Sequence, residues 1–71
     1  MNSETFSMVK AIRNNPKVKA RVTNYVRQMG HSGLVDIVSE MLYDGEASST
    51  PDGVWVDDGR IDWKIVASMV A

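Results

Sequence analysis

The amino-acid sequence predicts a mainly α, small single-domain helical fold over residues 1–71, and three observations support this prediction. Apolar residues recur at helical spacing in three separate stretches. Each stretch lies between residues that favour the start or the end of a helix. With 71 residues, 44% of them apolar, the chain can form one hydrophobic core, although it is near the lower size limit. We expect three helices, a short extended or hairpin segment and a C-terminal helix, in a helix-turn-helix or winged-helix-like arrangement.

The first predicted helix covers residues 3–13. Asn2 or Ser3 can accept hydrogen bonds from the amides of its first turn. The residues expected on its buried face are Phe6, Met8, Val9 and Ile12. Two asparagines and Pro16 follow, and the residue before a proline is disfavoured in a helix, so we expect the helix to end there.

The second predicted helix covers residues 16–29. Asn15 is placed to cap it, and Pro16 fits the first helical position, where its missing N–H costs no hydrogen bond. The residues expected on its buried face are Val18, Val22, Tyr25, Val26 and Met29. We expect Gly30 to end this helix as a left-handed cap.

The third predicted helix covers residues 33–44 and follows a very short turn, with Ser32 as its expected N-cap. The residues expected on its buried face are Leu34, Ile37, Val38, Met41 and Leu42. The residues expected on the opposite face are Asp36, Ser39, Glu40 and Tyr43. Gly45 is expected to end the helix.

Residues 45–61 are predicted to form a loop and a short strand. The stretch "GEASSTPDG" has the composition of a loop, and "VWV" at residues 54–56 favours an extended conformation. This run could pair with residues 60–63 as a wing-like hairpin across Asp58 and Gly59. The alternative, which we favour, is a fourth helix over residues 62–71 with Asp62 as its N-cap.

The charges are divided unevenly along the chain, although the net charge is only −1. Residues 1–30 contain six basic residues and one acidic residue, which gives +5. Residues 31–71 contain two basic and eight acidic residues, which gives −6. This asymmetry predicts an interaction with a charged partner.

The composition argues against several classes of function. There is no cysteine and only one histidine, so we expect neither a metal site nor a cofactor. Asp57 and Asp58 are neighbours in an extended run, where side chains point to opposite faces, so we expect no catalytic carboxylate pair and no enzyme. No apolar run reaches the ~20 residues of a membrane span, and the N-terminus does not resemble a signal peptide, which predicts a cytoplasmic protein.

The exposed side of the third predicted helix is acidic. Asp36, Glu40 and Tyr43 follow one another at helical spacing, and Asp44 and Glu46 extend the negative charge. One interpretation is an ordinary solvated face. The other is a contact surface for a basic partner, with the tyrosine as an amphipathic anchor among carboxylates. Such a surface could occupy a groove that normally binds nucleic acid.

Binding to DNA is the main alternative. A recognition helix approaches phosphates, yet the third predicted helix contains no lysine or arginine. The basic residues lie on the first two helices, and those of the second helix that we consider for binding a partner or nucleic acid are Lys17, Arg21 and Arg27. Lys17 and Arg21 share one flank of that helix, whereas Lys19 lies on the other, so they could also form a solvated basic surface.

Two stretches, "AIRNNPK" at residues 11–17 and "TNYVR" at residues 23–27, carry a resemblance to a known family. They resemble the opening of small host-takeover proteins of T7-like phages, which inhibit bacterial transcription by contacting a sigma factor and RNA polymerase. The resemblance covers about a quarter of the chain. It implies a short phage-encoded regulator without enzymatic activity, with Arg21, Tyr25 and Arg27 as candidate contact residues.

The sequence therefore predicts a small non-enzymatic regulator or inhibitor that binds a host protein with a basic or nucleic-acid-binding surface. The first alternative is a helix-turn-helix-like DNA-binding regulator. The second alternative is a self-associating structural protein, because five methionines and an apolar C-terminal stretch could form a dimer interface. The expected state is a monomer or a homodimer without membrane contact.

Overall fold

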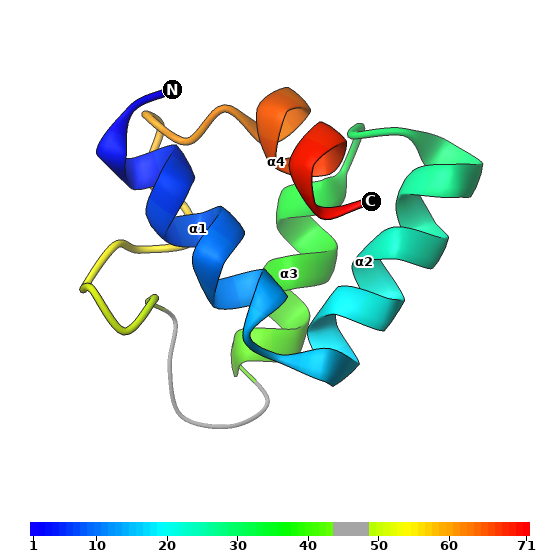
Figure 1. Ribbon diagram of the computed structural model, residues 1–71, viewed down its shortest axis with the longest axis horizontal. Helices are drawn as coiled ribbons and strands as arrows, with labels where there is room; N and C mark the ends of the chain where they lie inside the picture. The colour runs from blue at the N-terminus through cyan, green and yellow to red at the C-terminus, as the bar shows by residue number, and fades with distance from the viewer. Residues whose placement is uncertain (44–48) are drawn as a thin grey trace.

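The computed structural model describes residues 1–43 and 49–71, and of Leu42 and Tyr43 it describes the backbone. Within these residues the chain forms four α-helices, which confirms the prediction of a mainly α fold (Figure 1). They are α1 (Ser3–Arg13), α2 (Pro16–Met29), α3 (Leu34–Tyr43) and α4 (Trp63–Val70). None of the described helices is long and apolar enough to cross a lipid bilayer.

Polar side chains begin three of the helices by accepting hydrogen bonds from backbone amides that have no partner inside the helix. The Oδ1 atom of Asn2 accepts from Thr5 at 2.8 Å, and that of Asn15 accepts from Val18 at 3.3 Å. The Oδ1 atom of Asp62 accepts from both Lys64 and Ile65. The predicted starts of α1 and α2 are therefore confirmed, and Asp62 is the predicted N-cap of α4, whose first residue is Trp63.

The turn between α2 and α3 differs in detail from the prediction. Gly30 has a φ of 70° and a ψ of −148°, so its φ is positive but its ψ lies outside the left-handed helical region. Gly33, rather than Ser32, directly precedes α3 and has a φ of 74°. The carbonyl of Ser32 instead accepts a hydrogen bond from the hydroxyl of Tyr25. The helix begins at Leu34, and the predicted last residue, Asp44, lies outside the described residues.

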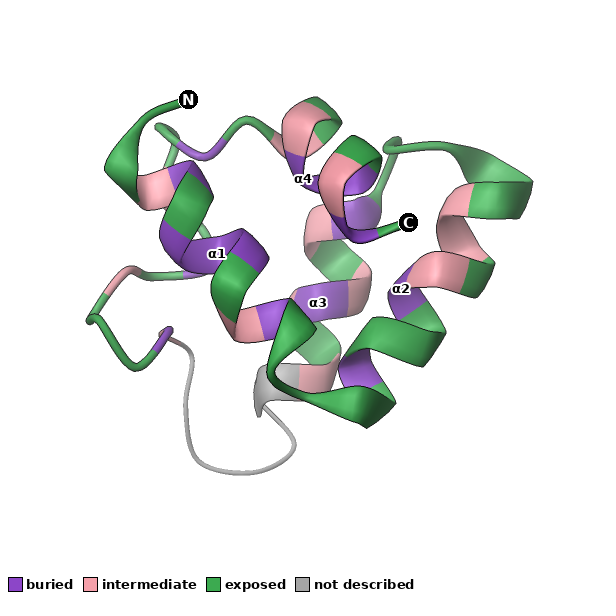
Figure 2. Ribbon diagram, in the orientation of Figure 1, coloured by how far each residue is buried: buried purple, intermediate pink, exposed green. Residues whose placement is uncertain are grey.

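The hydrophobic core forms where the inner faces of the four helices meet (Figure 2). The loop before α4 adds two apolar side chains to it. The buried apolar residues are Met8, Val9, Ile12, Val18, Val22, Leu34, Val38, Val56, Ile61, Val66, Ala67 and Val70.

Phe6 and Met29 are exposed, which corrects the prediction that both are buried. Their exposed fractions are 51% and 60%. On α1 the residues at ideal spacing for one face are Thr5, Met8, Val9 and Ile12, and all four are buried. Phe6 lies about 100° around the helix from Thr5 and therefore faces away from the core. The buried hydroxyl of Thr5 accepts a hydrogen bond from the backbone N–H of Asp62 at 2.9 Å.

The segment before α4 contains neither the predicted strand nor the hairpin in its described part, residues 49–61. Trp55 instead forms an isolated antiparallel bridge with Ser49. A tight turn between them is closed by the amide of Thr50, which donates to the carbonyl of Val54 at 2.8 Å. The buried Thr50 and Ser7 hydroxyls lie 2.7 Å apart and attach this turn to α1.

Candidate functional site

Of the predicted acidic face, the structure describes the side chains of two residues. Asp36 and Glu40 are exposed and lie one turn apart on α3. The Tyr43 side chain, Asp44 and Glu46 lie outside what the structure describes. The described part of the predicted acidic face therefore consists of two carboxylates on the outer side of α3.

The predicted basic residues Lys17, Arg21 and Arg27 are all exposed on α2. Lys17 and Arg21 are one turn apart near the start of the helix, whereas Arg27 lies in its last turn. The structure consequently brings the first two together and leaves Arg27 at the opposite end of the helix.

A groove lies between the beginning of α2 and the end of α3, and we call it the α2–α3 groove. It has a volume of about 410 Å³. That volume lies toward the lower end of the size range of ligand pockets. Figure 1 shows why these segments meet, because α2 and α3 run in opposite directions on either side of their short turn. The residues that line the groove are Asn15, Lys17, Val18, Arg21, Glu40 and Met41.

Charges of opposite sign line the two walls of this groove. Lys17 and Arg21 come from α2, and Glu40 comes from α3. Val18, which is buried, and Met41, which is half-buried, supply apolar surface between them. Sequence reasoning treated the acidic and basic residues as separate surfaces, but the fold joins three of them in one place.

Within the described residues, the three charged groups of the groove form no ion pair with one another or with any other side chain. Unpaired charges beside apolar surface can bind complementary charges from a partner, and such contacts contribute to specificity and association rate. The arrangement is therefore suited to binding a segment with both positive and negative groups.

The described ion pairs lie around α1 and the loop before α4, and none of them includes a residue of the groove. Lys10 contacts Asp52 at 2.9 Å, and Arg60 contacts Asp58 at 2.8 Å and Glu4 at 3.6 Å. Hydrogen bonds from Lys10, and secondarily from Ser7, lower the pKa of Asp52 below its ordinary value. Lys10–Asp52 and Glu4–Arg60 attach the loop to α1, whereas Asp58–Arg60 is a pair within the loop.

The residues considered for catalysis are not gathered into a reactive cluster. Asp58 binds Arg60, while its neighbour Asp57 is exposed. His31 is exposed in the turn between α2 and α3 and borders a shallow pocket of about 440 Å³ with Trp63 and Lys64. Among the residues that the structure describes, no group of three histidine, aspartate or glutamate side chains could hold a metal ion.

Asn15, Val18 and Met41 are groove residues that sequence reasoning assigned only to a cap or to the core. One signal could have identified them. A turn of only four residues makes two helices antiparallel neighbours, so the start of the second helix faces the end of the third.

Comparisons with protein-family models, with curated proteins and with solved structures find no match to this chain.

Proposed function

We propose that this protein is a small non-enzymatic regulator that binds another protein through the α2–α3 groove. The observation that carries the proposal is the combination of opposite charges and apolar residues in the lining of one groove, with Lys17 and Arg21 from α2 and Glu40 from α3. Protein interfaces characteristically combine a small apolar centre with a charged rim that sets orientation and specificity.

Charge complementarity defines the occupant as a protein segment. A carboxylate of the partner would bind Lys17 and Arg21, a basic side chain would bind Glu40, and an apolar side chain would pack between them. A nucleic acid fits this groove less well, because a phosphate drawn to Arg21 is repelled by Glu40. A helix or extended segment that carries all three kinds of side chain satisfies every wall of the groove.

The resemblance of residues 11–17 and 23–27 to host-takeover proteins of T7-like phages supports a class of partner. It favours a host protein that handles nucleic acid, such as RNA polymerase or its sigma factor, and it favours action in the bacterial cytoplasm. Arg21 belongs to both the groove and the contact residues that this resemblance implies. Tyr25 and Arg27 do not line the groove.

The test is the capture of a partner from a nuclease-treated bacterial lysate by the tagged full-length protein. We expect one protein to be retained in stoichiometric amount. We expect Arg21→Glu and Glu40→Lys each to weaken its binding by about tenfold or more, because each reverses a charge at the contact. Lys19→Glu is the matched control, since this residue is exposed on the other flank of α2. Equal loss of binding in all three variants, or in none, would contradict the groove as the contact.

A second candidate is a small DNA-binding regulator of helix-turn-helix-like design, which uses α2 as its basic surface. It is favoured by Lys17, Lys19, Arg21 and Arg27, which are exposed and form no ion pair with a described residue. Glu40→Lys distinguishes the two functions because it should change the binding affinity in opposite directions. It should weaken a protein complex in the groove but strengthen binding to duplex DNA, where it removes repulsion of a phosphate. Titrations at several salt concentrations measure both effects.

A further inference from the structure

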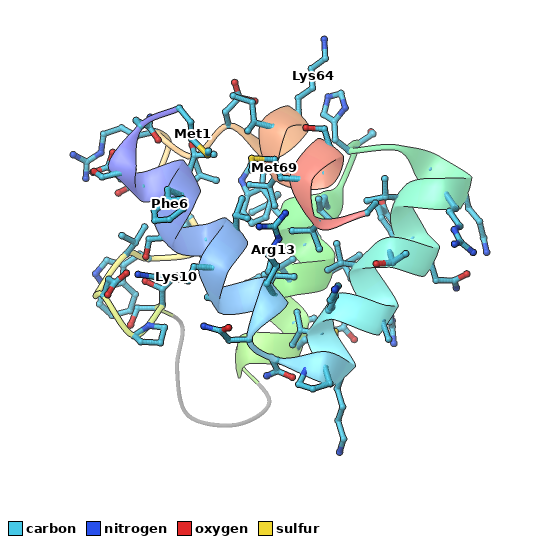
Figure 3. The ribbon with its side chains drawn as sticks, viewed as in Figure 1. Met1, Phe6, Lys10, Arg13, Lys64 and Met69 are labelled. Carbon is cyan, nitrogen blue, oxygen red and sulfur yellow. The ribbon has the colours of Figure 1, made fainter. Side chains whose placement is uncertain are left out.

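A second surface, separate from the groove, carries apolar side chains in solvent on the side formed by α1 and α4. Figure 3 shows Met1, Phe6 and Met69 with Lys10 and Arg13 beside them and Lys64 extending outward from the start of α4, and we call these residues the α1–α4 surface. Met1 is 62% exposed and Phe6 is 51% exposed, while Met69 is partly buried against the core. The basic residues of this surface are Lys10, Arg13 and Lys64.

The helical repeat of α1 aligns most of this surface. Phe6, Lys10 and Arg13 are four and three residues apart and therefore lie along one outer stripe of the helix. The amino group of Lys10 lies 5.6 Å from the centre of the Phe6 ring. Arg13 Nη2 donates a hydrogen bond to the carbonyl of Met69 at 2.6 Å, which joins the end of α1 to the end of α4. Contacts between the two helices thus hold the surface together.

The rim of this surface is positive. Lys10 is balanced by Asp52, with 2.9 Å between their charged atoms. Arg13 and Lys64 form no ion pair with any described residue. Exposed apolar side chains in a group mark contact sites more often than isolated ones do, and methionine adapts to partners of different shape.

We propose that the α1–α4 surface binds an acidic amphipathic segment of a partner protein. Carboxylates of the segment would bind Arg13 and Lys64, and an apolar side chain between them would cover Phe6 and Met69. This proposal goes beyond the groove, because its residues are Met1 and residues of α1 and α4, whereas those of the groove come from the α1–α2 turn, α2 and α3. A partner that uses both surfaces would contact two sides of the molecule.

Charge complementarity favours this occupant over two others. A second copy bound through the same surface would place Arg13 and Lys64 against residues of like charge. A single-stranded nucleic acid binds through several aromatic rings that stack on successive bases, whereas this surface offers one ring and two thioether side chains. Acidic residues combined with apolar residues complement both the rim and the centre.

The experiment is a selection of random displayed peptides on the immobilised full-length protein. We expect enrichment of peptides in which aspartate or glutamate flanks an aromatic or aliphatic residue. The affinity of the resynthesised peptides should fall by about tenfold or more for Phe6→Ser and for Lys64→Glu. Met29→Ser is the matched control, because this residue is an exposed apolar side chain like Phe6 but lies on α2. Unfolding temperatures of all variants verify that the fold is intact.

Several outcomes would overturn the proposal: no enrichment, enrichment of neutral or basic peptides, or acidic peptides that bind Phe6→Ser and wild type equally. Two further probes are oligothymidylate and vesicles of anionic phospholipid. The proposal would also be overturned if either probe bound in a way that depends on Phe6 while no acidic peptide was enriched. Self-association of the protein that Phe6→Ser abolishes would overturn it as well. Arg21→Glu and Glu40→Lys should leave peptide binding unchanged, so failure of the groove and failure of this surface are distinguishable.

Discussion

Asp58 and Arg60 form the most extensive ion pair among the described residues. Arg60 donates to the two carboxylate oxygens of Asp58 through Nε at 3.1 Å and Nη2 at 2.8 Å, and its backbone N–H donates at 2.9 Å. Hydrogen bonds to a charged carboxylate favour the charged form. The side-chain bonds, and then the backbone bond, lower the pKa of Asp58 from 3.8 to about 2. Protonation of Asp58 in acid therefore removes the charge that binds Arg60.

We predict that Asp58→Asn makes unfolding less dependent on acid pH. Folding lowers the pKa of Asp58, so the pair stabilises the folded state above pH 3.8, and this contribution is lost as the pH falls toward about 2. The unfolding temperature, measured by circular dichroism across this range, should therefore fall less steeply in the variant. Asp57→Asn is the control, because its exposed carboxylate forms no ion pair with a described residue. A slope identical to wild type in Asp58→Asn would refute the role of the pair.

At the scale of the elements, the turn between α2 and α3 sets how the two helices meet. Gly33 has a φ of 74°, a conformation that costs other residues about 1–2 kcal/mol. A Cβ atom at this position would also lie 2.6 Å from the hydroxyl oxygen of Tyr25. Gly30 has a similar φ of 70°, but a Cβ there would meet no atom within 4 Å. The two glycines therefore share a positive φ, and a close contact with another side chain would arise at Gly33 alone.

We predict that Gly33→Ala lowers the free energy of unfolding by more than Gly30→Ala does, and by at least ~1–2 kcal/mol. Urea unfolding measures both. Removing the hydroxyl in the double variant Gly33→Ala, Tyr25→Phe should recover part of the loss relative to Tyr25→Phe alone. If the double variant recovers none of the loss, the contact with Tyr25 has no energetic role.

The helices were predictable from the sequence because their signals are local. Asn15 and Asp62 accept hydrogen bonds from amides within three residues, so their effect can be read without knowledge of the fold. The prediction for Phe6 is wrong because it follows from apolar character alone, whereas the polar Thr5 has the spacing of the buried face. Apolarity alone does not define the buried face of a helix.

The loop before α4 and the groove were not predictable in the same way, because both depend on residues far apart in the sequence. Ser7 meets Thr50 across 43 positions, and no pattern within either segment indicates this pairing. Predicting the groove requires the direction of α2 relative to α3, and only the short turn between them indicates that direction. The charges of Lys17, Arg21 and Glu40 were identified, but their common location was not.

At the scale of the whole molecule, a small number of side chains carry the stability. Leu34 is completely buried and is among the largest residues of the core. A core of this size supplies no more than about 3–5 kcal/mol of net stability. A leucine truncated to alanine in a core costs about 2–5 kcal/mol, so one substitution is comparable with the total.

We predict that Leu34→Ala leaves a large fraction of the molecules unfolded at room temperature without denaturant. Circular dichroism and one-dimensional NMR measure that fraction. Met29→Ala is the control, since its side chain is 60% exposed and its truncation should change the stability by less than about 0.5 kcal/mol. A cooperative Leu34→Ala protein with wild-type stability would show that the core tolerates this cavity.

The contact between α1 and α4 has a consequence for synthesis of the protein in the cell. The ribosome makes α1 first, but α4, which supplies Val66, Ala67 and Val70 to the core, is made last of the four described helices. Until α4 leaves the ribosome, the part of α1 that packs against α4 in the folded protein has no helix to cover it. The nascent chain can therefore complete its core, including the packing of α4 against α1, only after α4 has emerged.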